Sequence, residues 1–307
     1  MPTGVGADSD VNDWSPSQTC SSALRKVGIS YLTTGQSLNF FEVNEDGTGK
    51  WAEDRMGLAL TPQASVWSVT TGASPGELWA GSNDGKVWQR TGAANTNGTW
   101  VAEQALPAGN IVYSVAYADG VVFAVGERGY VAVRTGTKWS TPYQYTALAG
   151  STMGRSDALY GVWAADKNTA FAVGSHGLLV RYSSGIWQTM PQKIDDQANE
   201  LNGIWGTSDH TVFAVGDNSK ILRIRYSDGP GAQWNPISNV PSSTTLWAVR
   251  GDSGGAVYAT GNSGVVLRDA QRGQEQGGAK RQAGLHDIGA IHGGFPRGGA
   301  LPGSLLL

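Results

Sequence analysis

The chain repeats one short pattern at an interval of forty-odd residues. An aromatic residue followed by Ala, usually within the text Phe-Ala-Val-Gly, marks each copy, and a run such as SVWSV, IVYSV, LYGVW, LNGIW or TLWAV precedes it by about eleven residues. The spacings between successive aromatic anchors are 44, 48, 42 and 45 residues; the anchors are Trp79, Phe123, Phe171, Phe213 and Tyr258. A second series, in which each tryptophan follows a turn, keeps the same interval; it comprises Trp51, Trp100, Trp139, Trp187 and Trp234. Self-similarity at such an interval is the signature of a repeat architecture.

One repeat contains four short predicted strands. In the fourth full copy they are residues 201–205, 211–215 and 220–224, with a last strand near Trp234. Each run is rich in β-branched or aromatic residues and is bounded by Gly, Asn, Asp or Ser, and no helical periodicity separates the runs. Four antiparallel strands in forty-odd residues are the unit of a β-propeller, so we expect an all-β propeller of four-stranded blades. A pair of β-sandwiches is the alternative, but it would not need one pattern at one interval throughout.

The constant residues of the repeat are expected to form the core. The first strand carries a small residue where the innermost strands converge, and the aromatic anchors fill the wedge that widens between blades; the small residues are Ser68, Ser114, Gly161, Gly203 and Ala248. The changing residues lie in the turn between the second and third strands, where exposure lets them vary; they are Glu127-Arg128, Ser175-His176, Asp217-Asn218 and Asn262-Ser263.

About six blades are visible, either as a whole ring or as part of a seven-bladed one. Four are clear, at 64–104, 110–146, 158–190 and 200–240. Residues 27–57 read as the second to fourth strands of an earlier blade with a faint first strand, and residues 245–268 as the first three strands of a sixth.

The propeller is therefore assigned to residues 27–268, after a weakly structured segment at 1–26. Residues 269–307 form a low-complexity tail without the Val, Trp, Tyr, Thr and Asn of the repeat. We expect this tail to be an out-of-frame or truncated end with few contacts to the ring.

Composition narrows the classes of function. A net charge of −3 and a pI near 5.8 give no electrostatic attraction to nucleic acid, and no apolar run is long enough to span a membrane. Cys20 is the single cysteine, which rules out an intramolecular disulfide and any multi-cysteine metal site. No signal peptide is visible. We expect a monomer that needs neither a cofactor nor a metal.

Two short segments resemble motifs known from enzymes. Residues 251–255 spell GDSGG, as around a serine-protease nucleophile, and overlap an Arg-Gly-Asp triplet at Arg250. Their phase in the repeat places them in the turn between the first and second strands, and no histidine has the context of a catalytic base, so we expect a polar turn. Ser82 to Trp88 partly resembles the Asp-box of sialidases, which is a folding turn. His176 and His210 fall in different turn classes, and His286 and His292 in the tail, so they are not expected to share a metal.

The pattern aromatic-Ala-Val-Gly-x-x-Gly, followed by an aliphatic pair, Arg, a turn and Trp, resembles a bacterial propeller family. It is carried by Phe123–Trp139, Phe171–Trp187, Phe213–Trp234 and Tyr258–Arg268, and it resembles photosystem II assembly and stability factor-like propellers and secreted propeller proteins of myxobacteria. The resemblance implies a non-enzymatic binding or assembly scaffold that works outside the cytoplasm. One branch of the family contacts its client through arginines, and the corresponding third-strand arginines here are Arg90, Arg134, Arg181, Arg223 and Arg268; solvent-facing arginines packed along a strand are the plainer interpretation.

The surface loops are the remaining candidates for function. The longest connections to a following first strand are 140–158 and 188–200, and they should emerge beside the second-to-third turns. The residue types enriched at binding sites there are Tyr143, Tyr145 and Arg155, to which the turns add Arg128 and His176. We expect a non-catalytic scaffold that binds a protein or a glycan through this face. The alternative is a sialidase-like glycoside hydrolase, whose paired carboxylates would be Asp195 and Asp196 near Glu200.

Overall fold

The structure is a computed structural model of the 307-residue chain. It describes residues 9–10, 27–32, 37–43, 49–55, 66–74, 76–92, 98–144, 158–190, 200–207, 210–228, 232–237, 240, 243–251, 256–269 and 285–287, of which those before 66 and after 269 are described as backbone only. The chain forms two compact units, one within residues 1–144 and one within residues 145–295. Each unit is described by itself.

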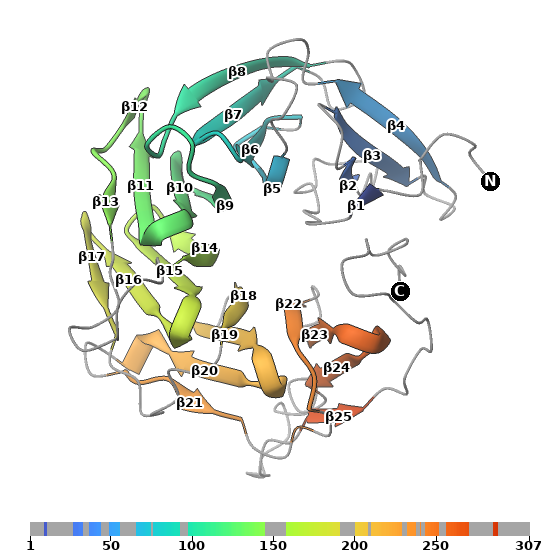
Figure 1. The fold of residues 1–307 in the computed structure, drawn as a ribbon, viewed down its shortest axis with the longest axis vertical. Coiled ribbons are helices and arrows are strands. Elements are labelled where there is room, and N and C mark those ends of the chain that lie inside the picture. The colour runs from blue at the N-terminus through green and yellow to red at the C-terminus, as the bar shows by residue number, and fades with distance from the viewer. Residues whose placement is uncertain are drawn as a thin grey trace. The chain divides into compact units, whose positions relative to one another are not determined.

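Unit 1 carries three antiparallel sheets built from consecutive strands (Figure 1). The first has the order β1-β2-β3-β4, the second β5-β6-β7-β8, and the third β9-β10-β11-β12 with β13 also paired to β11. Their bounds are β1 Ser9–Asp10, β2 Val27–Leu32, β3 Ser37–Val43, β4 Gly49–Arg55, β5 Val66–Thr71, β6 Leu78–Ser82, β7 Lys86–Thr91, β8 Thr99–Gln104, β9 Val112–Ala118, β10 Val121–Gly126, β11 Tyr130–Thr135, β12 Lys138–Trp139 and β13 Tyr143–Gln144.

Unit 2 carries three further antiparallel sheets of four consecutive strands each. The orders are β14-β15-β16-β17, β18-β19-β20-β21 and β22-β23-β24-β25. Their bounds are β14 Leu159–Asp166, β15 Thr169–Gly174, β16 Leu179–Ser183, β17 Ile186–Thr189, β18 Leu201–Gly206, β19 Thr211–Gly216, β20 Ile221–Arg225, β21 Asn235–Pro236, β22 Leu246–Gly251, β23 Val257–Gly261, β24 Val266–Asp269 and β25 Leu285–Asp287.

The predicted assignment of the repeat to strands is confirmed. Every aromatic anchor lies in the second strand of its sheet, and the turn tryptophans lie in or directly before the fourth. The faint first strand before residue 27 is β1, which pairs with β2. The sixth repeat, expected to have only three strands, has a fourth: β25, from the expected tail, pairs with β24. The rest of the tail lies outside the described residues.

Neighbouring sheets meet through their first strands. In unit 1, β5 lies beside β9; in unit 2, β14 lies beside β18 and β18 beside β22 (Figure 1). A Cβ on Gly203 would come within 2.8 Å of the carbonyl oxygen of Trp247, and one on Gly161 within 3.1 Å of the Ile204 side chain. Close packing of the neighbouring first strand therefore leaves little room for a side chain at these two glycines, as predicted for the small residues.

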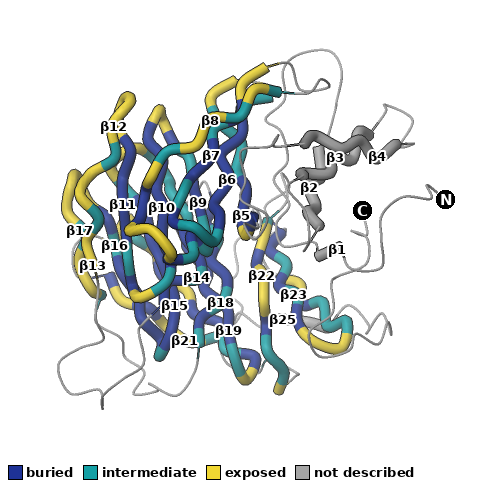
Figure 2. The backbone as a smooth tube through the Cα atoms, turned by 45° about the horizontal axis from the view of Figure 1, so that its top comes forward, coloured by how far each residue is buried: buried dark blue, intermediate teal, exposed yellow. Residues whose placement is uncertain are grey.

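The aromatic anchors point into the space before the following sheet. Phe171 packs in a buried cluster with Trp234 and Leu222 of the next sheet, its ring 6.2 Å from that of Trp234. Phe213 does the same against Val249 and Leu267 of the sixth sheet. Figure 2 shows the result: burial follows the second and third strands, while the fourth strands β8, β12 and β17 are largely exposed. Burial of these large aromatics is the main force that joins one sheet to the next.

Candidate functional site: the turn edge

Four 3-10 turns link second to third strands and bind the start of the first strand of their own sheet. They are η2 (Glu127–Gly129), η3 (Ser175–Gly177), η4 (Asp217–Ser219) and η6 (Asn262–Gly264). In each, the first backbone N–H donates to the carbonyl of the residue just before the first strand; the acceptors are Ile111, Ala158, Glu200 and Thr245, at 2.8 to 3.0 Å. Turn tips and first-strand starts therefore share one edge in each of these four sheets, as predicted, and we call the corresponding edge of a sheet its turn edge.

In three of these turns, the side chain of the first residue also binds the start of the first strand: its oxygen accepts the backbone N–H of the residue just before that strand. Ser175 Oγ accepts the backbone N–H of Ala158 at 2.9 Å, Glu127 Oε2 that of Ile111 at 3.2 Å, and Asp217 Oδ2 that of Glu200 at 3.4 Å. The expectation that both variable turn residues are solvent-exposed is therefore wrong for this position, where Ser175 is buried and the two acids are half-buried.

The second turn residue is the outward one. Arg128, His176, Asn218 and Ser263 adopt positive φ angles of 53 to 59°. Arg128, Asn218 and Ser263 are exposed and His176 is half-buried. Variation at this position leaves the bonds described above intact.

In five of the six described sheets, the second residue of the first strand lies on the turn edge of its own unit, and four of these five residues are aromatic; we call the set the aromatic row. In unit 1 it consists of Trp67, 38% exposed, and Tyr113, whose rings meet edge to face with centroids 5.5 Å apart. In unit 2 it consists of Tyr160, Asn202 and Trp247. Trp247 is 53% exposed, although its indole N–H donates to Asn262 Oδ1 at 2.7 Å. An exposed indole held in one orientation is a surface suited to binding.

The polar groups around the row in unit 2 are interlinked. Asn202 Nδ2 donates to the carbonyl of Leu246 at 3.0 Å, and Thr245 Oγ1 donates to Asp217 Oδ1 at 3.0 Å, so both bonds cross from the fifth sheet to the sixth. Tyr160 Oη lies 3.3 Å from Ser175 Oγ. A hydrogen bond between Tyr160 and Glu200 links the fourth sheet to the fifth, so the bonds of the turn edge of unit 2 connect three sheets.

Two carboxylates, Glu200 and Asp217, lie near the Tyr160 phenol on this surface. Burial raises the pKa of the Tyr160 phenol above its ordinary value of 10.0, and the negative charge of Glu200, its hydrogen bond and the charge of Asp217 add to the rise against an opposing bond from Ser175. Glu200 Oε2 is buried and has no hydrogen-bond partner in the described part of the chain. The phenol therefore stays protonated at neutral pH.

The aromatic row was missed by the sequence-based expectation of the site, although its signal was present. The runs VWS, VYS, LYG, LNG and LWA each hold the row residue between a buried aliphatic and the small residue. Only the small residue was interpreted there, because the row is interrupted by Asn202 and aromatic residues elsewhere in the repeat are core.

The predicted loop residues are placed only in part. Tyr143, in β13, is 60% exposed on the fourth-strand side of the third sheet, and Arg128 and His176 stand on the turn edge as expected. Tyr145, Arg155, Asp195 and Asp196 lie outside the described residues. Their roles stay predictions.

The five arginines do not form one series, which corrects their alignment as equivalent positions. Their strand partners show two registers: Arg181, Arg223 and Arg268 lie opposite the anchors Phe171, Phe213 and Tyr258, whereas Arg90 and Arg134 lie opposite Leu78 and Val122. A shift of one residue turns a side chain to the other face of a sheet.

The shifted arginines are buried, not solvent-facing. Arg134 binds Glu103 of the preceding sheet, with Nε to Oε2 at 2.5 Å and an Nη2 bond to Oε1 at 2.7 Å, and its guanidinium lies 4.7 Å from the Trp79 ring. Arg90 is fully buried and donates to the Gly76 carbonyl at 2.6 Å. Both act inside the fold, while Arg223 and Arg268 are exposed and Arg181 is half-buried over Phe171.

The described residues of the GDSGG motif and of the Asp-box-like motif have structural roles. Gly251 ends β22, and a Cβ there would overlap the indole of Trp205 in the fifth sheet. Glycine at this position therefore leaves room for the neighbouring tryptophan. Ser253 lies outside the described residues. In the Asp-box-like turn, Trp88 Nε1 donates to Ser82 Oγ at 3.0 Å and Ser82 Oγ to Asp84 Oδ1 at 2.6 Å, as in a folding turn.

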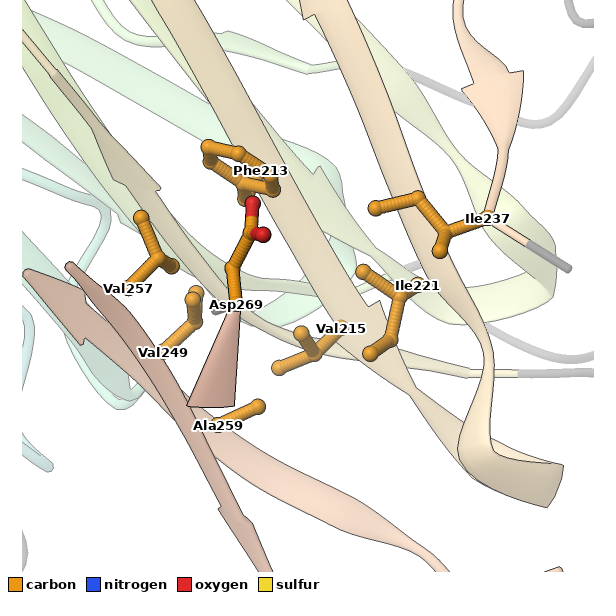
Figure 3. A pocket seen from close by; sticks show the side chains of 8 residues that line it. All are labelled: Phe213, Val215, Ile221, Ile237, Val249, Val257, Ala259 and Asp269. Atoms are coloured by element: carbon orange, nitrogen blue, oxygen red, sulfur yellow. The ribbon is translucent and has the colours of Figure 1, made fainter. Parts of the chain in front are cut away.

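Other site types are sparse in the described residues. No three His, Cys, Asp or Glu side chains converge there, and no helix there is long and apolar enough to cross a membrane. A cavity of about 10 Å³ lies between the fifth and sixth sheets, lined by apolar side chains with the carboxylate of Asp269 directed toward Phe213 (Figure 3). It has room for about one water molecule, not for an organic ligand.

Comparisons with known proteins identify the fold. No protein-family model matches the chain, and no curated protein matches it either. Many solved structures are similar to the chain, and three of them illustrate the likeness. The WD40 β-propeller domain of Doa1 has 13% identity and a TM-score of 0.61 over 93% of this chain and 85% of its own. An inactive H270A virginiamycin B lyase from Staphylococcus aureus with quinupristin has 14% identity and a TM-score of 0.65 over 92% and 86%.

The third is YCF48 bound to the D1 peptide, with 16% identity and a TM-score of 0.50 over 67% of this chain and 65% of its own. At these identities the likeness shows the fold alone: the chain has a β-propeller fold, as its repeat predicts.

Proposed function

We propose that this protein is a non-catalytic propeller that binds a protein partner through the turn edge of its sheets. The observation that carries the proposal is the aromatic row, in which Trp67 and Trp247 remain 38% and 53% exposed on the edge where the turns meet the first strands. Large exposed aromatics at a fixed position of a repeat are not required by the fold, because Asn202 occupies the same position in the fifth sheet. Tryptophan and tyrosine are the residues that most often dominate protein recognition.

Structural neighbours and the sequence resemblance are consistent with this role. One neighbour, YCF48, is solved with a peptide bound. The resemblance to photosystem II assembly factor-like and myxobacterial secreted propellers adds the proposal that the chain works as an assembly scaffold outside the cytoplasm. A glycan remains the second class of partner, since an exposed indole also stacks on sugar rings.

The hydrolase alternative has one observation in its favour: Tyr160 lies next to Glu200 and Asp217 on the turn edge. A nucleophilic tyrosine needs a lowered pKa, whereas that of Tyr160 is raised by burial and by those carboxylates. Another neighbour, virginiamycin B lyase, is an enzyme on the same fold, so the fold alone does not decide.

Capture of the partner tests the proposal. The purified chain is used as bait in extract of its source cells, in parallel with Trp247→Ala and with Ile186→Ala, a matched control that removes a 61% exposed side chain from the fourth strand β17. Trp247→Ala should lose the specific partner and Ile186→Ala should keep it. Equal capture by both variants would place the binding surface elsewhere, and turnover of glycoside substrates that is lost in Glu200→Gln would favour the hydrolase.

A further inference from the structure

We propose that the thioether of Met190 is a site of reversible oxidation by peroxide, and that the resulting sulfoxide loosens the contact between the fourth and fifth sheets. This inference is independent of the proposed function. Met190 lies directly after β17, the fourth strand of its sheet, and its backbone N–H donates to the Leu179 carbonyl at 2.8 Å. Its side chain packs against the buried cluster that contains Phe171 of the fourth sheet and Trp234 of the fifth. Met190 is therefore part of the contact between the two sheets.

The sulfur of Met190 accepts a hydrogen bond from a buried indole. Trp234 Nε1 donates to Met190 Sδ at 3.4 Å, and Trp234 is 1% exposed. The edge-to-face contact with Phe171 holds the Trp234 ring in this position. A buried indole N–H normally has an acceptor, and the loss of that acceptor destabilises the fold. The thioether is a weak acceptor, but it fills this role between the two sheets.

Met190 is open to a small oxidant. It is half-buried, unlike Trp234, and hydrogen peroxide is little larger than a water molecule. A lone pair of the sulfur attacks one peroxide oxygen, so that an S–O bond forms and the O–O bond breaks. The departing oxygen takes up the proton of the transferred one and leaves as water. The sulfur is oxidised by two electrons and the peroxide is reduced by two, which converts one thioether into one sulfoxide.

The sulfoxide does not suit this position. Its new oxygen has no room between Sδ and the Trp234 Nε1, because these two atoms are only 3.4 Å apart. If the oxygen turns toward water instead, the indole N–H faces a sulfur that carries a partial positive charge and accepts poorly. The Met190 side chain also becomes polar where it packs on apolar residues. Oxidation therefore weakens the contact between the sheets in either orientation.

Controlled oxidation of the full chain tests the inference. The protein is treated with dilute hydrogen peroxide, peptide mass spectrometry locates the oxidised residues, and urea denaturation measures the stability. Oxidation of Met190 should lower the urea midpoint by about 0.5 M, as expected for the loss of one hydrogen bond, and methionine sulfoxide reductases should restore it. Met190→Leu is the matched control, because it keeps an apolar side chain, Cys20 and the other three methionines. Its midpoint should be the same with and without peroxide.

A second variant, Trp234→Phe, tests the part played by the indole. It keeps an aromatic ring but removes the donor to Met190 Sδ, so oxidation should lower its midpoint by less than that of the wild type. An equal fall in both proteins would overturn the role of this hydrogen bond. The inference as a whole is wrong if Met190 stays unmodified in the folded chain under peroxide that oxidises it in urea. It is also wrong if oxidation of Met190 leaves the midpoint unchanged, or if peroxide lowers the midpoints of wild type and Met190→Leu equally.

Discussion

Gly216 shows how one residue fixes the geometry of the turn edge. Its φ is −168°, which any residue adopts, so backbone freedom is not the reason for glycine here. A Cβ at this position would overlap the carbonyl oxygen of Glu200, which accepts the N–H of Asp217 at 3.0 Å. Gly174 and Gly126 stand in the same relation to Ala158 and Ile111. The glycine of the Ala-Val-Gly text is therefore needed for close approach of two backbone segments.

Gly216→Ala should lower the free energy of unfolding by about 2 kcal/mol, because a backbone carbonyl must move to admit the methyl group. Urea denaturation measures the change. Gly136→Ala is the control: φ there is +61°, and nothing lies within 4 Å of its Cβ position. It should cost about 1 kcal/mol, from backbone conformation alone. An equal loss in both variants would mean that the carbonyl contact is not what selects glycine.

Asp84 should make the free energy of unfolding depend on pH in the acid range. Burial raises the pKa of its carboxyl, but hydrogen bonds from Lys86 and Ser82 outweigh this and hold it below the ordinary 3.8. A depressed pKa stabilises the fold above the unfolded-state value, and that stability is lost as pH falls through the folded-state value. Asp84→Asn should therefore cost about 1 kcal/mol at pH 7 and progressively less below about pH 4.

Urea denaturation of both proteins across this pH range measures the effect. Lys86→Gln removes the 2.7 Å ion pair and should produce a similar loss that does not add to that of Asp84→Asn. A difference between wild type and Asp84→Asn that stays constant down to pH 3 would contradict the assignment.

At the scale of the elements, contacts between sheets depend on which face a side chain occupies. Arg134 in β11 faces the preceding sheet, where it binds Glu103 of β8 and stacks on Trp79 of β6. Arg223 in β20 lies on the other face relative to its anchor and is exposed. The same residue type therefore links two sheets in one repeat and covers a surface in another.

Arg134→Lys should lower the unfolding free energy by about 1–2 kcal/mol, because lysine supplies neither the two-point bond to Glu103 nor a planar group for the Trp79 ring. Arg223→Lys should change it by less than about 0.5 kcal/mol. Denaturation of the two variants side by side provides the comparison. Losses of the same size would show that Arg134 is not a link between the sheets.

At the scale of the whole molecule, the repeat was sufficient to predict the fold class, the strands and the close approach of the first strands. Three features were not accessible in the same way. Glu127, Ser175 and Asp217 each accept a backbone N–H through a side-chain oxygen. Because these three residue types have little else in common, their shared role was not evident from the sequence. The arginines follow their anchors by either ten or eleven residues, and this difference of one residue changes the face of the sheet on which the side chain lies. β25 lacks the tryptophan that marks the other fourth strands.

The sequence predicted which edge of the sheets carries the candidate site, but not most of the residues that form it. The coincidence of turns with first-strand starts followed from the propeller unit, and Arg128 and His176 were placed on it correctly. Trp67 and Trp247 were not predicted, because only their exposure distinguishes them from the many aromatic residues of the core. Exposure depends on how the sheets pack, which the sequence pattern does not give. Glu200 and Asp217 come together only through the bonds of the turn.

Footprinting by hydrogen–deuterium exchange of the chain with and without its partner tests the central claim, that recognition takes place on the turn edge. Binding should protect first-strand starts and second-to-third turns, such as residues 200–203, 216–219 and 244–248 in unit 2. The opposite edge, such as residues 183–186 and 225–228, should exchange at the same rate in both samples. Protection confined to that opposite edge, with the turn edge unchanged, would contradict the account.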